Sequence, residues 1–125
     1  MTAIKTLFLV ILLFFITGCV SKQPNKSTSS TILIKTPVLK YHDKGFINYF
    51  DDYIHLQLLN IGTVVLDLTI YKTKVCESTF KCISSNRFNQ KYLHPSYDED
   101  FLYTLFTSKR IYFKDKKNNV FIKVK

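Results

Sequence analysis

The sequence predicts a mainly β protein of the α+β class, in which a curved antiparallel sheet or incomplete half-barrel packs on one amphipathic helix near residues 97–108. Two observations predict this class. Phe and Tyr contribute 11 and 8 of the 125 residues, and together with β-branched residues they favour pleated, half-buried surfaces. Apolar and polar residues also alternate along several short segments, as in strands with one buried face. A hydrophobic content of 46% excludes a disordered chain.

The first 18 residues have the pattern of an export signal. Lys5 precedes an unbroken apolar run over residues 7–16, which matches a signal peptide, whereas a membrane-spanning helix needs about 20 residues. Residues 15–19, Phe-Ile-Thr-Gly-Cys, resemble the bacterial lipobox. That resemblance implies cleavage after Gly18 and covalent lipid on Cys19, with no other cofactor. An ordinary secreted protein with a chance Cys at the cleavage site is the alternative.

The predicted organisation is a signal peptide (1–18), a lipidated flexible tether (19–31) and a single β-rich domain (32–125). Removal of the signal leaves 107 of the 125 residues, enough for one small core. The segment 21–31 contains no large apolar residue and has nothing to bury. Enterobacterial lipoproteins that are retained carry Asp directly after the lipidated Cys, whereas this sequence has Val20 there. We therefore expect a lipid anchor in the outer membrane, at its periplasmic face.

The domain should begin with two strands and a hairpin. Residues 32–40 form a strand interrupted at Pro37, and residues 45–49 form a second short strand. Residues 54–58 and 64–70 then alternate between apolar and polar side chains, which predicts two strands with one apolar face each. Asn60 and Gly62 in the connection favour a tight antiparallel turn.

Two further strands, 74–77 and 81–84, carry Cys76 and Cys82. Their spacing superficially suits a metal clip, but export to an oxidising compartment favours a disulfide. A helix over 97–108 follows, because its apolar residues share one face and Ser96 and Glu99 have capping-box spacing. Residues 111–113 and 120–124 form the last hairpin.

Few residues suggest chemistry. The histidines at 42, 55 and 94 are scattered, so we expect no metal site, and the sequence contains no catalytic motif, so we expect no enzyme. The acidic cluster 98–100 complements a helix dipole. Export argues against nucleic acid as a partner despite the formal charge of +9. The basic residues near the C-terminus form either a solvated face or a contact to phosphate head groups.

Residues 56–68 carry a family resemblance. A strand, a short tip with Asn and an aliphatic residue before Gly, and a second apolar strand precede a helix. This order resembles the LolB/LolA family of lipoprotein receptors and carriers, and it implies an incomplete barrel whose apolar interior accepts acyl chains. Membrane lipid and lipoproteins delivered by a periplasmic carrier would be the partners. By motif position Ile61 would be the membrane-contacting tip, and the acyl cavity would be lined by Ile54, Leu56, Leu58, Leu66, Leu68 and Phe101.

A second interpretation remains open. The chain is then a small structural lipoprotein that docks onto an envelope complex, and its apolar faces are ordinary core.

Overall fold

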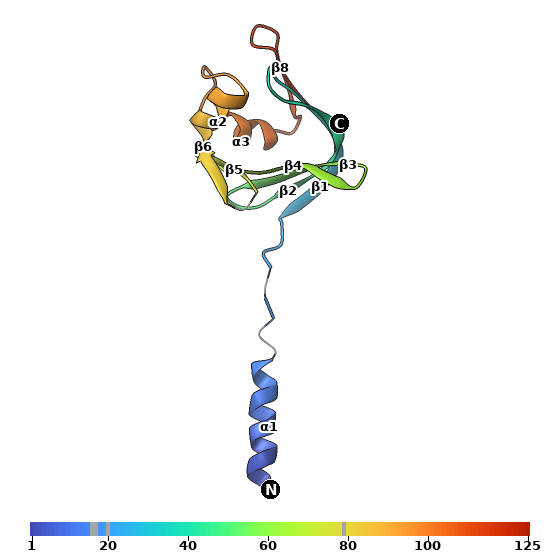
Figure 1. Cartoon of the computed structure of the whole chain (residues 1–125), viewed down its shortest axis with the longest axis vertical. Helices are drawn as coiled ribbons and strands as arrows, with labels where there is room; N and C mark the ends of the chain where they lie inside the picture. Colours follow the sequence, from blue (N-terminus) through green and yellow to red (C-terminus); the bar gives the residue numbers. More distant parts are fainter. Residues whose placement is uncertain (16–17, 20, 79) are drawn as a thin grey trace.

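The computed structural model describes residues 1–15, 18–19, 21–78 and 80–125. Eight antiparallel strands form one open sheet in the order β6-β5-β4-β3-β2-β1-β8-β7. The sheet curves around two short helices that lie in its concavity (Figure 1). The predicted mainly β, α+β class with an incomplete curved sheet is confirmed.

The elements follow one another mostly as neighbours in the sheet. The strands are β1 Lys26–Lys35, β2 Lys40–Tyr49, β3 Ile54–Asn60, β4 Thr63–Ile70, β5 Lys74–Glu77, β6 Lys81–Ser84, β7 Tyr112–Asp115 and β8 Val120–Val124. The helices are α1 Thr2–Phe14, α2 Ser85–Tyr92 and α3 Phe101–Phe106. The exception is the step from β6 to β7, which lie at opposite edges of the sheet; β8 joins the last hairpin to β1.

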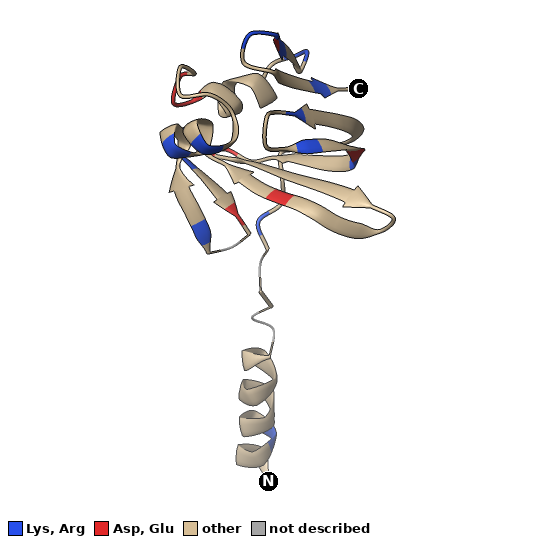
Figure 2. Cartoon of the chain, turned by 45° about the horizontal axis from the view of Figure 1, so that its top comes forward, with Lys and Arg blue, Asp and Glu red and all other residues tan. Residues whose placement is uncertain are grey.

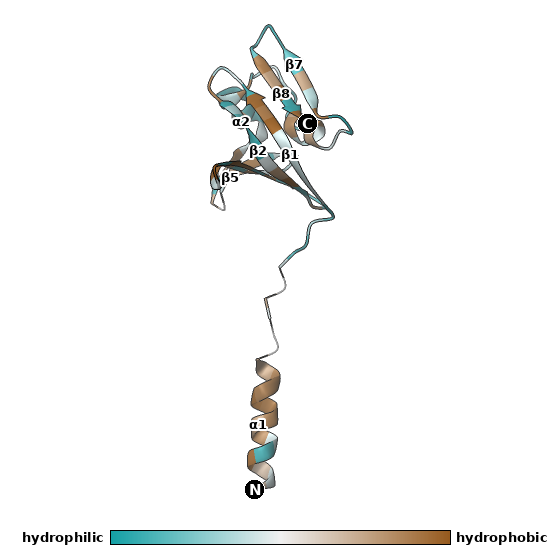
Figure 3. Ribbon diagram, turned by 90° about the vertical axis from the view of Figure 1, so that its right-hand side faces the viewer, coloured by the Kyte–Doolittle hydropathy of each residue, from teal (hydrophilic) through white to brown (hydrophobic). Residues whose placement is uncertain are grey.

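Helix α1 lies within the predicted signal peptide. It is apolar along nearly its whole length (Figure 3), and its side chains are exposed. Among the described residues, no helix is both long and apolar enough to cross a membrane. Ile16 and Thr17 of the predicted lipobox, and Val20 after it, lie outside the described residues.

The core lies between the concave, inner face of the sheet and the helices. Strand register places the apolar residues of neighbouring strands opposite one another, as in the Leu56–Leu68 and Ile34–Ile122 pairs. Phe88 of α2 and Leu102 and Phe106 of α3 complete this cluster. Burial of these large side chains is the main force that holds the helices in the concavity.

The first strand begins earlier than the sequence predicts. Residues 26–31, placed in the flexible tether, belong to β1 and pair in continuous register with β2, from Lys26 opposite Tyr49 to Thr31 opposite Lys44. The backbone ladder with β2 orders this polar segment without any apolar side chain of its own. The predicted interruption at Pro37 is the turn between β1 and β2, closed by a hydrogen bond from Thr36 N–H to the Leu39 carbonyl at 2.8 Å.

The helical region also differs from the prediction. Helix α3 covers only Phe101–Phe106 of the predicted 97–108. Ser96 does not cap it, because its hydroxyl lies 2.6 Å from His94 Nδ1 and its N–H donates to the same nitrogen. Helix α2 was not predicted; the Ser84 hydroxyl accepts from Arg87 N–H at its first turn.

Candidate functional site

The residues predicted to line an acyl cavity lie on the inner face of the sheet, apart from Phe101 in α3. Ile54, Leu56, Leu58 and Leu68 are buried, and Leu66 and Phe101 pack against the same cluster. The enclosed apolar space under α2 and α3 has a volume of about 10 Å³. An acyl chain would need roughly 300 Å³ or more. In this structure the space under α2 and α3 is therefore filled, and acyl binding there, still a prediction, would require it to open.

The predicted tip residue projects from the sheet. Ile61 is 99% exposed and lies in the turn between β3 and β4. Its φ is 49° and that of Gly62 is 75°, so two consecutive residues adopt the left-handed region typical of a tight hairpin turn. A large aliphatic residue gains nothing from folding at this position. The turn therefore leaves the Ile61 side chain exposed to the surroundings of the molecule.

Cys76 and Cys82 are joined by a disulfide. They are direct cross-strand partners in β5 and β6, with Cα atoms 3.9 Å apart, slightly closer than the usual range of about 4.4–6.8 Å. The bond links the edge strand β6 to the rest of the sheet. Cys19 is a free, exposed thiol.

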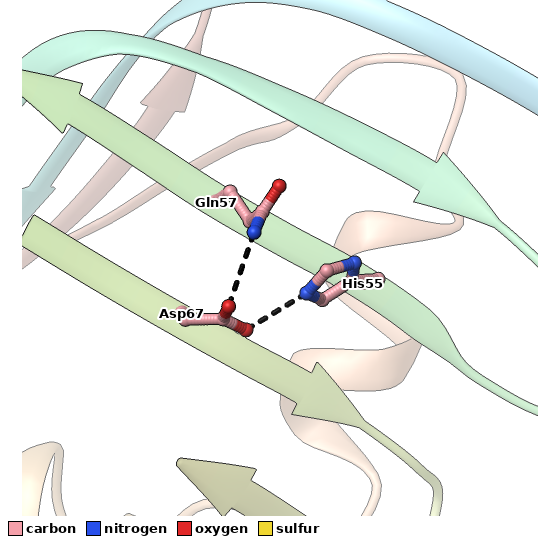
Figure 4. Close-up of polar contacts among 3 residues, drawn as sticks. All are labelled: His55, Gln57 and Asp67. Carbon is pink, nitrogen blue, oxygen red and sulfur yellow. Dashed lines mark hydrogen bonds and ion pairs between the residues drawn. The ribbon is translucent and has the colours of Figure 1, made fainter. Parts of the chain in front are cut away.

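A polar cluster that the sequence did not indicate lies on the convex, outer face of β3 and β4. The Asp67 carboxylate accepts hydrogen bonds from His55 Nε2 at 2.8 Å and Gln57 Nε2 at 3.1 Å (Figure 4). Gln57 is the cross-strand partner of Asp67, and His55 is its diagonal neighbour. His55 and Asp67 keep 28% and 34% of their side chains exposed. Ligands in solution can therefore reach both side chains.

This cluster forms one side of a groove of about 490 Å³. Aromatic rings form another side: Phe50 stacks on Tyr53 with centroids 4.5 Å apart, and Tyr53 lies 5.2 Å from Tyr71. The Lys74 ammonium lies 4.6 Å from the centre of the Tyr71 ring. The disulfide also lines the groove.

The hydrogen bonds of His55 define what this cluster presents to a ligand. His55 Nε2 donates a hydrogen bond to Asp67. The other ring nitrogen, Nδ1, has no hydrogen-bond partner among the described residues, and no described hydroxyl or thiol hydrogen-bonds the ring. A nucleophile–base pair, which covalent catalysis requires, is thus not assembled at His55 among the described residues. Nor do the described residues bring together three His, Cys, Asp or Glu side chains in a manner that could hold a metal ion.

The alternation of residues in β3 and β4 places 55, 57 and 67 on the outer face, but alternation alone does not show which of them are neighbours. Once the turn at residues 60–63 is set, hairpin register fixes which outer-face residues are neighbours, and polar residues 55, 57 and 67 fall together. A bulge between Leu58 and Leu59 shifts that register by one residue. Counting back from the turn without the bulge would pair Gln57 with Leu66, so the cluster could not be identified by counting alone.

Comparison with known proteins gives no relative for this chain: no family model, curated protein or solved structure matches it.

Proposed function

We propose that the chain is a lipid-anchored protein of the bacterial outer membrane whose folded domain docks onto a partner in the envelope and performs no chemistry of its own. The observation that carries this proposal is that the region predicted to receive an acyl chain, under α2 and α3, is filled. The apolar side chains that would have received an acyl chain pack against α2 and α3 and leave about 10 Å³. What the domain offers to other molecules is therefore its surface, including the outer-face groove and the projecting turn.

The anchor is supported by the apolar run before Cys19 and by the exposure of that thiol. Cys19→Ser should abolish incorporation of a fatty-acid analogue in growing cells and release the domain from the washed outer-membrane fraction. The Cys76→Ser/Cys82→Ser variant is the matched control, because it loses two thiols but keeps Cys19 and should be labelled like the parent. Equal labelling of the Cys19→Ser variant would refute the anchor.

A second candidate function is delivery of lipoproteins to the membrane, as the resemblance to the LolB/LolA family implies. One observation favours it: Ile61 is 99% exposed at the end of a long hairpin, as a membrane-contacting tip requires. In this case Ile61→Glu should slow transfer of a labelled lipoprotein from carrier to membrane without changing the melting temperature. Val38→Glu, at another exposed aliphatic residue in a different turn, should leave transfer unchanged.

The same pair of variants discriminates between the two functions. Transfer that is insensitive to Ile61→Glu at unchanged stability removes the delivery function and leaves docking. In that case a photo-crosslinking amino acid at position 61 or in the groove at position 71 should yield a discrete protein adduct in cells. Crosslinking to lipid alone from both positions would contradict docking to a protein complex.

A further inference from the structure

A second groove, of about 600 Å³, lies on the inner face where β1 begins. One wall is the first half of β1, with Lys26, Thr28 and Ser30, and the other is the segment 107–111 that joins α3 to β7. Ile47, Tyr49 and Val124 also line it. No Asp or Glu occurs among the described residues that line the groove.

The groove stays open because the inner face of β1 changes character along the strand. Ile32 and Ile34 are buried in the core, whereas Ser30, Thr28 and Lys26 continue the same face towards the start of the strand. Short hydroxyl side chains do not fill the space that isoleucines would occupy. The polar segment of the chain thus leaves a hollow lined with hydrogen-bonding groups.

The walls of the groove are fixed to one another. The Tyr49 hydroxyl donates to the Phe106 carbonyl at 2.8 Å, and Val124 N–H donates to the Ile111 carbonyl at 3.0 Å. Burial raises the pKa of Tyr49, so its hydroxyl remains a protonated donor. These bonds hold the segment 107–111 against β2 and β8 before any ligand arrives, which lowers the entropic cost of binding.

The groove carries three cations: Lys26, Lys109 and Arg110. None of them forms an ion pair with a described carboxylate. Lys26 Nζ lies 5.7 Å from the centre of the Tyr49 ring, and the Arg110 guanidinium lies 5.2 Å from that of Tyr112. Basic residues outnumber acidic ones by 18 to 9 in the chain as a whole, and Figure 2 shows acidic residues at only a few places. Uncompensated Lys and Arg beside hydroxyl groups are the chemistry that binds phosphate.

The start of β1 is also the part of the domain that is closest along the chain to Cys19. Asn25 is already held to the sheet, because its N–H donates to the Tyr49 carbonyl at 2.7 Å. Only seven residues, 19–25, precede Lys26 after the cleavage site. Fully extended, they span at most about 24 Å. A lipid on Cys19 therefore keeps the groove close to the phosphate layer of the membrane.

We propose that this groove binds the phosphate of an anionic phospholipid head group in the membrane that holds the anchor. The inference rests on the proposed lipid anchoring. Two attachments, one covalent and one through the groove, would fix the orientation of the domain on the membrane, which a short tether alone does not do.

The test uses the full chain, produced in a bacterium that processes lipoproteins and purified in a neutral maltoside detergent. Native mass spectrometry measures the fraction of protein that retains phosphatidylglycerol, phosphatidylcholine or inorganic phosphate. Phosphatidylglycerol should be retained about fivefold more than phosphatidylcholine. Lys26→Gln/Lys109→Gln/Arg110→Gln should lower its retention at least roughly tenfold.

The matched control is Lys114→Gln/Lys116→Gln/Lys117→Gln, which removes the same charge from β7 and the loop after it and should retain phosphatidylglycerol like the parent. All six residues are exposed, so thermal melts of both variants should match the parent. Equal losses in the two triple variants would mean general charge attraction and would overturn the proposal. Inorganic phosphate bound through the same three residues, with no preference for phosphatidylglycerol, would overturn the lipid assignment.

The same spectra separate this inference from the anchor. The mass of the chain reports whether Cys19 carries lipid. A chain without that lipid that still retains phosphatidylglycerol through the groove would refute the anchor and leave the binding site intact. A lipidated chain with no groove-dependent retention would refute the binding site alone.

Discussion

The inner face of the sheet is closed at one place and open at another. Under α2 and α3, the space between Leu56, Ile70 and Phe106 is about 10 Å³, whereas beside the start of β1 the groove measures about 600 Å³. Both places belong to the same concave face. Large aliphatic and aromatic side chains fill the first, and Thr28 and Ser30 leave the second empty. A curved sheet therefore does not by itself make a binding cavity; the size of its inward side chains decides.

The largest effect is expected from a cavity-creating substitution in the closed region. Leu56→Ala should lower the free energy of unfolding by about 2–5 kcal/mol, because the fully buried side chain leaves a cavity among packed neighbours. Thr28→Ala in the open region should change it by less than about 0.5 kcal/mol. Urea denaturation of both variants measures the difference. Equal losses would mean that the open groove is as tightly packed as the core.

Gly45 tests how tightly the sheet packs between the two regions. A Cβ atom there would lie 2.5 Å from the Gln57 carbonyl oxygen and 2.7 Å from Ile32 Cδ1. Gly45→Ala should therefore destabilise by about 1–3 kcal/mol, since the backbone of β3 cannot easily move away. At Gly62 a Cβ atom would meet nothing within 4 Å, and only the φ of 75° opposes it. Gly62→Ala should cost about 1 kcal/mol, and a larger loss there than at Gly45 would contradict this packing.

The disulfide tests whether the edge of the closed region needs a covalent link. Cys76→Ser/Cys82→Ser should lower the free energy of unfolding by about 2 kcal/mol, as expected for so short a loop. Helices α2 and α3 should remain, because α2 is also held by Phe88 in the core. Circular dichroism and a thermal melt measure the two quantities. Free thiols at both positions in protein taken from the envelope would show that the bond does not form there.

The smallest effect concerns pH. The Tyr97 hydroxyl, which precedes α3, donates to Asp115 Oδ2 at 2.7 Å and lowers the pKa of that carboxyl, with Asn118 adding to the shift. The Tyr97 hydroxyl is protonated throughout the acid range, and burial raises its pKa further. The contribution of Asp115 is therefore present above about pH 4 and is lost as pH falls through its lower folded-state pKa.

Tyr97→Phe should remove most of this pH dependence. Between pH 5 and pH 2.5 the parent should lose more stability than the variant, so that their denaturation midpoints converge in acid. Urea titrations at several pH values measure this convergence. A constant difference between the two proteins across that range would show that the hydrogen bond does not set the pKa of Asp115.

The hairpins were predictable because their determinants are local. Residues 74–77 and 81–84 form β5 and β6 with the predicted bounds, and the turn at Asn60 and Gly62 joins β3 to β4 as expected. For β3 and β4, alternation and turn residues agree, and no distant segment has to be known. The last hairpin was expected at 111–113 and 120–124 around a polar loop; β8 has the expected bounds, whereas β7 covers Tyr112–Asp115.

The polar strand and the helices depended on information that the local pattern does not contain. Residues 26–31 are strand because β2 offers them a complete ladder, although nothing in their composition favours burial. Helix α2 consists largely of polar residues and forms where Phe88 and Asn89 can be buried, Asn89 donating to the Asp98 carbonyl at 2.8 Å. The two grooves were not foreseen, since each combines segments that lie far apart in the sequence.

The position of β1 has a mechanical consequence. It lies inside the sheet, between β2 and β8, and pairs with both in antiparallel register. A pull on the chain at the proposed lipid anchor would act along β1. It would load the ladder with β2 in shear from Lys26 onward, and then the ladder with β8, which begins at Ile32. An edge strand such as β7 would instead peel away one bond at a time. With the proposed lipid on Cys19, the chain would enter the domain at a central strand rather than at an edge of the sheet.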